Sequence, residues 1–170
     1  VIACSNSGGH FGAELKNAGW DMVIFEGRSE KPVYLFIDDD EAQLLDASEI
    51  WGKSVWETEP AIKSMHQDPE IKIASIGVAG EKMVRFACVV NDLDRAAGRS
   101  GVGAVMGSKQ LKAIAVKGNK GIGVKDMAAF LAAAAVSNKR IADDDEAKGL
   151  TEDGTMSMMN VTNSYGSLPT

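Results

Sequence analysis

The apolar residues of this chain of 170 residues change their spacing near residue 120, and this change constrains the fold more than any other feature. Before it, short apolar runs are separated by glycines and charged residues, which is typical of strands joined by turns. After it, alanine and methionine dominate, and the apolar residues between positions 124 and 142 recur at the spacing of one helix face. We therefore predict one domain over residues 1–120 and the start of a helical domain over residues 121–170.

The first part of the chain contains a series of strand-like runs. They lie at residues 21–27, 33–37, 71–76, 84–90 and 111–116. The first and second runs are predicted to pair as a hairpin, and so are the third and fourth, because turn-forming residues separate them. Helices are predicted at residues 12–18, 55–66 and 103–110. Hairpins mixed with helices, without strict alternation of strand and helix, indicate an α+β fold.

The composition excludes several classes of protein. Apolar residues make up 45% and charged residues 25%, close to the averages for globular domains, which excludes collagen-like and disordered chains. The longest apolar stretch, residues 128–136, is far shorter than the roughly 20 residues of a membrane-spanning helix. Cys4 and Cys88 have neither disulfide nor metal-ligand spacing, which favours the cytoplasm. The net charge of −6 argues against a nucleic-acid partner.

Both ends of the sequence resemble internal segments of a longer chain. The sequence begins without methionine on Val1-Ile2-Ala3-Cys4, a pattern typical of a buried strand. It stops at Leu168-Pro169-Thr170, which is typical of a turn. We therefore expect the chain to be a fragment of a larger protein.

Residues 95–120 carry the most informative charge pattern of the chain. They include six basic residues and no acid, whereas the rest of the chain has a net charge of −12, since the whole carries −6. The basic residues are Arg95, Arg99, Lys109, Lys112, Lys117 and Lys120. Interspersed glycines let backbone N–H groups approach an anion, and arginine binds phosphate oxygens in pairs, so the pattern predicts a phosphate site. A tight turn beside a solvated basic face would have the same composition, and the residues alone leave both interpretations open.

Known nucleotide-binding motifs do not match this segment. After Gly101 and Gly103, Met106 stands where a dinucleotide motif needs its third glycine, and the spacing from Gly101 to Lys109 does not fit a Walker A loop. A phosphate bound here would therefore belong to another kind of cofactor.

A second polar loop, residues 5–12, follows the apolar start of the chain. It offers the side-chain amide of Asn6 and the open backbone of Gly8 and Gly9, although the N-terminal cap of a helix would have a similar sequence. The chain has no nucleophile elbow, no paired histidines on a helix and no third cysteine. We therefore assign it no catalytic residue.

These two loops and their surroundings resemble the N-terminal domain of the tungsten-containing aldehyde ferredoxin oxidoreductases. The resemblance runs from residue 1 to about residue 118, and its most specific motifs are Asn6-Ser7-Gly8-Gly9-His10 and Arg95-Ala96-Ala97-Gly98-Arg99. Further matching segments are residues 30–34, 46–53, 74–81 and 91–92. The resemblance implies a β-rich mixed-sheet platform domain, truncated here, with the start of a helical domain after it.

The resemblance also implies the activity of the parent protein. Such enzymes oxidise aldehydes to carboxylic acids and pass the electrons through a 4Fe-4S cluster to ferredoxin. Their tungsten is held by two molybdopterin-type pterins, whose phosphates are bridged by magnesium. A cytoplasmic homodimer, or a complex with an iron–sulfur subunit, is implied as well. The ligands of the cluster would lie outside this chain.

Five residues of this chain match cofactor-contacting positions of the family. By this resemblance, Asn6 would contact magnesium and phosphate through its side chain, and Ala96 would offer its carbonyl to magnesium. Gly8 would offer backbone, and Arg95 and Gly98 would contact pterin or phosphate. A non-catalytic module that binds a nucleotide or another phosphorylated ligand through the same loop is the alternative.

Overall fold

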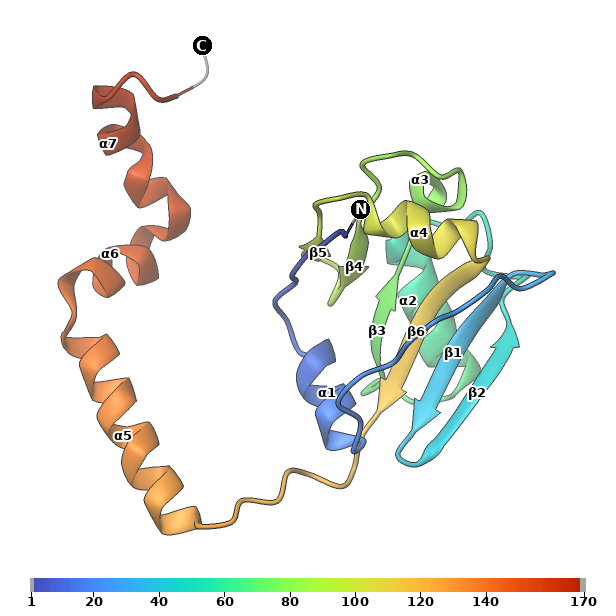
Figure 1. Ribbon diagram of the computed structural model, residues 1–170, viewed down its shortest axis with the longest axis horizontal. Coiled ribbons are helices and arrows are strands. Elements are labelled where there is room, and N and C mark those ends of the chain that lie inside the picture. Colours follow the sequence, from blue (N-terminus) through green and yellow to red (C-terminus); the bar gives the residue numbers. More distant parts are fainter. Residues whose placement is uncertain (1, 169–170) are drawn as a thin grey trace. The chain divides into compact units, whose positions relative to one another are not determined.

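The computed structural model describes residues 2–168 and divides into two compact units between Ile122 and Gly123 (Figure 1). The first unit is built on a six-stranded sheet with the order β2-β1-β6-β3-β4-β5. Its strands are β1 (Val33–Asp38), β2 (Glu41–Asp46), β3 (Lys72–Ser75), β4 (Val89–Asn91), β5 (Arg95–Ala97) and β6 (Leu111–Lys117). β1 and β6 run parallel and every other pair is antiparallel, so the predicted α+β fold with a mixed sheet is confirmed.

Both faces of the sheet are covered by helices. The helices of this unit are α1 (Phe11–Asn17), α2 (Val55–Met65), α3 (Val78–Glu81) and α4 (Val102–Ser108). Alternate residues of β1 point to opposite faces: Tyr34 joins a buried cluster with Ile62 of α2, and Ile37 joins a second cluster with Leu15 of α1. Figure 1 accordingly shows α1 and α2 on opposite sides of the sheet. The helices predicted at residues 12–18, 55–66 and 103–110 are thereby confirmed.

The predicted hairpin of residues 21–27 with residues 33–37 is wrong. Residues 21–27 form no strand, and β1 pairs instead with β2 and β6. Val23 and Phe25 pack half-buried on the second cluster, whereas Met22 and Ile24 are exposed. The alternation therefore reflects packing of an extended segment, and not pairing in a ladder.

The second predicted hairpin is confirmed in its pairing, because β3 lies antiparallel to β4 with Ser75 opposite Val90. β3 covers most of the first run, but only residues 89 and 90 of the second run are in a strand, because residues 84–88 form a turn and irregular backbone. The expected buried strand at the start of the chain is wrong for residues 2–4, which belong to no strand, and Ile2 is exposed. Val1, Pro169 and Thr170 lie outside the described residues.

The second unit consists of short helical elements. They are α5 (Met127–Asp143), α6 (Asp145–Asp153), the 3-10 helix η1 (Gly154–Met158) and α7 (Met159–Ser164). Asp126 and Asp144 begin α5 and α6 as N-caps, each accepting a hydrogen bond from a backbone N–H three residues later. The helix predicted over residues 124–142 is confirmed. No helix among residues 2–168 is both long enough and apolar enough to cross a bilayer.

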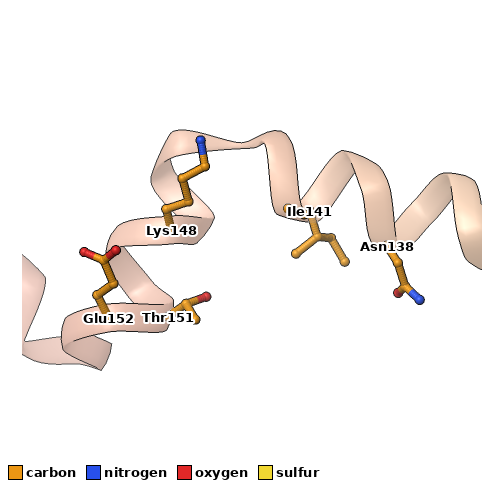
Figure 2. A pocket seen from close by; sticks show the side chains of 6 residues that line it. Asn138, Ile141, Lys148, Thr151 and Glu152 are labelled. Carbon is orange, nitrogen blue, oxygen red and sulfur yellow. The ribbon is translucent and has the colours of Figure 1, made fainter.

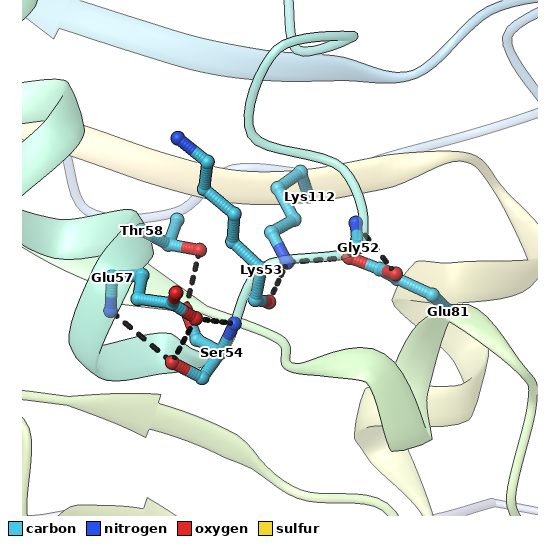
Figure 3. A network of polar contacts seen from close by, with 7 residues as sticks. All are labelled: Gly52, Lys53, Ser54, Glu57, Thr58, Glu81 and Lys112. Carbon is cyan, nitrogen blue, oxygen red and sulfur yellow. Dashed lines mark hydrogen bonds and ion pairs between the residues drawn. The ribbon is translucent and has the colours of Figure 1, made fainter.

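A buried ion pair joins α3 to the sheet. The Lys112 ammonium, on β6, donates to the Glu81 carboxylate and to the Lys53 carbonyl, the latter at 2.7 Å (Figure 3). Both oxygens of Glu81 also accept the Gly52 N–H at 2.9 Å. Burial lowers the pKa of Lys112, and the hydrogen bond with Glu81 opposes that effect. The ion pair thus fixes α3 to β6. α3 packs in turn against α4, which follows the loop of residues 98–101.

Candidate functional site

The two polar loops predicted from the sequence lie side by side, at the end of the sheet formed by β4 and β5 (Figure 1). The Asn91 side-chain amide donates to the Gly8 carbonyl at 3.1 Å, and the Arg99 N–H donates to the Ser5 hydroxyl at 3.0 Å. The fold therefore brings together two segments that are more than 80 residues apart in the sequence.

Left-handed backbone conformations occur in the turn of the β4–β5 hairpin and in the turn that follows it. Asp92 and Leu93, in its turn, have φ angles of 46° and 61°. Ser100 and Gly101, between β5 and α4, have φ angles of 64° and 66°. Such conformations cost a leucine or a serine free energy and are concentrated at binding sites. A side chain at Gly101 would also overlap the carbonyl of Arg85, so this turn requires glycine.

Three of the five predicted site residues line one open hollow. Asn6 reaches it from the loop of residues 5–12, and Ala96 and Gly98 from β5 and the residue after it, around a volume of about 440 Å³. Its other lining residues are Cys4, Ser5 and Arg99. The remaining two predicted residues lie against each other, since a Cβ on Gly8 would be 3.9 Å from the Arg95 side chain.

Arg99 is the one charged residue among the three lining residues that the sequence prediction did not assign. It belongs to the basic segment and to the family motif Arg95-Ala96-Ala97-Gly98-Arg99, but the resemblance gave it no role. No ion pair engages Arg99 within the part of the chain that the structure describes. Arg95 lies 3.7 Å from the Asp94 carboxylate, and its side chain remains 60% exposed. Two guanidinium groups are thus available to an anion at this end of the sheet.

The other basic residues of segment 95–120 serve structural contacts instead. Lys109 donates to the Gly27 carbonyl, Lys112 pairs with Glu81, Lys117 pairs with Asp68 and Lys120 pairs with Asp40. The hydrogen bond with Asp68 accordingly raises the pKa of Lys117. The continuous basic stretch seen in the sequence therefore separates in space, and only its two arginines lie at the paired loops.

The donor set of the hollow fits a phosphate with a hard cation. The amide oxygen of Asn6 and the carbonyl of Ala96 are the oxygen ligands that magnesium prefers. Ala96 lies on β5, the edge strand of the sheet, so one side of its backbone has no strand partner. A Cβ on Gly98 would meet nothing within 4 Å, which leaves its backbone open to a ligand.

The described residues offer few ligands to a cation at this place. Residues 2–168 contain no cluster of three His, Cys, Asp or Glu side chains that could hold a metal ion. Magnesium commonly keeps water and phosphate ligands and takes few from the protein. The arrangement therefore suits a cation that arrives with a phosphorylated cofactor.

An apolar cavity of about 520 Å³ adjoins the polar hollow and shares Ser5 with it. Phe11, Phe25, Val89 and Met106 are among its lining residues, and Asn91 is one of its few polar ones. A polar hollow beside an apolar cavity suits a ligand that combines phosphate with a ring system.

A further hollow, of about 380 Å³, lies within the second unit between α5 and α6. Asn138, Lys148 and Glu152 contribute its polar groups. Figure 2 shows that these side chains point in different directions, and Lys148 is paired with Asp145 at 2.8 Å. This hollow therefore presents no convergent binding groups.

Comparison with known proteins gives consistent matches. Residues 1–118 match the sequence family described as aldehyde ferredoxin oxidoreductase, N-terminal domain. The chain is 51% identical, over 170 residues, to proteins named tungsten-containing aldehyde ferredoxin oxidoreductase from Thermococcus kodakarensis and Pyrococcus abyssi. Each alignment covers 99% of this chain and 28% of the relative, so the chain spans about a quarter of the length of these curated relatives.

More distant matches have other names. A Pyrococcus furiosus protein named aliphatic sulfonate oxidoreductase, WOR-like subunit, is 41% identical over 120 residues, which cover 64% of this chain and 19% of that protein. Among solved structures, the active-site complex BamBC of benzoyl coenzyme A reductase, with 1,5-dienoyl-CoA, matches with a TM-score of 0.80 and 38% identity. That match covers 84% of this chain and 22% of the other chain.

Proposed function

The chain belongs to the aldehyde ferredoxin oxidoreductase family, and from this membership we propose that it is part of the catalytic subunit of a tungsten-containing enzyme that oxidises aldehydes to carboxylic acids. Residues 1–120 would form part of its N-terminal tungstopterin-binding domain, and residues 121–170 would begin a helical domain. Identities of 51% to relatives of that name, against 41% to the sulfonate oxidoreductase subunit, favour an aldehyde as the substrate.

The pairing of the two loops is the observation that supports this function best. Asn6 and Ala96 would hold magnesium, while Gly8, Arg95 and Gly98 would hold the phosphate and pterin of the cofactor. When bound, the tungsten bis-pterin would supply the redox chemistry. The residues of this chain would bind and orient it, because charge-assisted hydrogen bonds from arginine fix a phosphate in position.

Electron transfer would require parts of the protein beyond this chain. Its two cysteines, Cys4 and Cys88, are too few for a 4Fe-4S cluster, which normally takes four thiolates. The cluster ligands would therefore lie elsewhere in the parent protein. Ferredoxin would receive the electrons in the cytoplasm, and a homodimer or a complex with an iron–sulfur subunit would form the complete enzyme.

The comparisons do not support the alternative of a non-catalytic module that binds a nucleotide or another phosphorylated ligand. The relatives that match over 99% of the chain are named as oxidoreductases.

Purification of the full-length protein that carries this chain tests the proposal. We expect tungsten in stoichiometric amount by elemental analysis, together with reduction of ferredoxin that depends on an added aldehyde. A protein free of tungsten, or one that reduces ferredoxin equally with and without aldehyde, would contradict the proposal.

A further inference from the structure

The loop that carries Asn6 and Gly8 is held in an unusual way. It belongs to no strand, and within residues 2–168 no backbone–backbone hydrogen bond involves residues 2–9. Its position against the β4–β5 hairpin therefore depends on hydrogen bonds in which at least one partner is a side chain.

Asn91, the last residue of β4, supplies two of these hydrogen bonds. Its Oδ1 accepts from the Ser7 hydroxyl at 3.2 Å, and its Nδ2 donates to the Gly8 carbonyl at 3.1 Å. The residue is only 6% exposed, whereas Ser7 and Gly8 lie above it at the surface. The buried amide thus binds the loop through its donor and its acceptor at once.

Weaker or exposed hydrogen bonds attach the loop to the hairpin region on either side of the Asn91 contacts. The Asp92 carboxylate accepts the N–H of His10, and the Ser100 hydroxyl lies 3.5 Å from the Cys4 carbonyl. Gly9 has a φ of +90°, and a side chain there would overlap the Asp92 carboxylate. The loop therefore lies directly on the hairpin, with Asn91 beneath its centre.

We propose that Asn91 is the positioning residue that keeps the two halves of the cofactor site together. This inference rests on the proposed function, because Asn6 and Gly8 on one side, and Arg95 and Ala96 on the other, can share a ligand only while the loop stays on the hairpin. Asn91 is not one of the predicted cofactor-contacting residues and would act through its hydrogen bonds to Ser7 and Gly8.

The chemistry of an amide suggests a diagnostic substitution. In Asn91→Asp, an ionised carboxylate would still accept from Ser7, but its other oxygen would face the Gly8 carbonyl without a proton to donate. Protonation of that carboxyl would restore an O–H donor in the same place. Burial and the Asp92 carboxylate raise the pKa of such a group, whereas the Arg95 guanidinium, whose side chain also lies against Gly9, opposes this. Attachment of the loop should therefore depend on pH in this variant and not in the wild type.

Hydrogen–deuterium exchange of the full-length protein at pH 5 and pH 8 tests this, with rates corrected for intrinsic exchange at each pH. In Asn91→Asp we expect the amides of His10 and Arg99, which donate to Asp92 and Ser5 across the two segments, to lose about tenfold to a hundredfold protection at pH 8 and to recover part of it at pH 5. The amides of α2 should exchange as in the wild type, and tungsten per subunit should fall. Asn138→Asp, the same change at an exposed position of α5, should alter neither the exchange at the loop nor the tungsten content.

The outcomes separate the two proposals. Wild-type protein without tungsten would refute the proposed function, while exchange of the His10 and Arg99 amides would still decide whether Asn91 holds the loop. Unchanged protection and full tungsten in Asn91→Asp at pH 8 would overturn the positioning role and leave the function standing. If Asn91→Asp does not fold, Ser7→Ala removes one of the two bonds without burying a charge. The His10 and Arg99 amides of this variant should then lose protection selectively, and unchanged protection would overturn the inference.

Discussion

The ion pair of Lys112 and Glu81 provides the most quantitative prediction for the fold beneath the site. The Lys112 side chain is fully buried, and that of Glu81 is 5% exposed. In Lys112→Met the Glu81 carboxylate would stay buried with only the Gly52 N–H as a partner. Removal of one member of a buried pair typically costs about 3–5 kcal/mol, because the other charge is left uncompensated. We therefore expect Lys112→Met to lower the free energy of unfolding by an amount in that range.

The double variant Lys112→Met/Glu81→Leu distinguishes charge pairing from simple loss of packing. It removes the stranded carboxylate but leaves the Lys53 carbonyl without its donor, which costs about 1–3 kcal/mol, while the N–H of the exposed Gly52 can turn to water. The double variant should therefore be more stable than Lys112→Met by roughly 2 kcal/mol. The double-mutant cycle should accordingly give a coupling energy well away from zero.

Urea unfolding followed by circular dichroism measures these differences. With a urea dependence of about 1–3 kcal/mol per molar, a loss of about 4 kcal/mol moves the midpoint by more than 1 M. The reasoning would be refuted if the free energy of unfolding of Lys112→Met lay within about 1 kcal/mol of the wild-type value. It would also be refuted if the loss in the double variant equalled the sum of the losses in the two single variants.

Three further predictions concern pH, packing and metal content. His66 stacks on Phe36 with 3.8 Å between the ring centroids, and burial lowers its pKa. As the pH falls below about 6.5, His66 therefore takes up a proton more readily in the unfolded state than in the folded state. Stability should therefore decline from pH 7.5 to 5, and by less in His66→Gln when both are melted at each pH. A side chain at Gly107 would overlap the Gly80 carbonyl, so Gly107→Ala should lose about 1–3 kcal/mol in a thermal melt; an unchanged melting temperature would show that α3 and α4 can separate freely. The chain expressed alone should be colourless because it has two cysteines, and stoichiometric iron with absorption near 400 nm would contradict this.

Local signals predicted α1, α2 and α4, but not the four-residue α3. Ser54 and Glu57 form a complete capping box at the start of α2, so this helix begins where the sequence indicates. Such signals act over a few residues and need no knowledge of the rest of the fold.

Strand partners were harder to predict because they depend on distant parts of the chain. β1 lies parallel to β6, which begins at Leu111, and antiparallel to β2, whose residues are mostly exposed. β2 carries none of the β-branched residues that mark a strand, since its place at the sheet edge requires little burial. Residues 21–27 show the opposite case, with an alternating pattern but no partner strand.

The candidate site was predicted in part by composition and mainly by resemblance. Charge counting located the segment of Arg95 and Arg99, but it could not show that Lys112 and Lys117 are engaged elsewhere. It also could not identify Asn91, because a single asparagine at a strand end has no distinctive pattern. Its importance follows only from the loop that the fold places above it.

The central claim is that the paired loops hold an anionic metal cofactor, and tungsten content tests it most directly. Tungsten per subunit should be measured in full-length wild type, Arg95→Ala and Lys117→Ala, with circular dichroism to verify folding. Loss of the charge-assisted hydrogen bonds of Arg95 costs about 1.5–3 kcal/mol, one to two orders of magnitude in affinity, so Arg95→Ala should be partly loaded. Lys117→Ala should load fully, because its ammonium pairs with Asp68. Equal tungsten in all three proteins would contradict the assignment of this site.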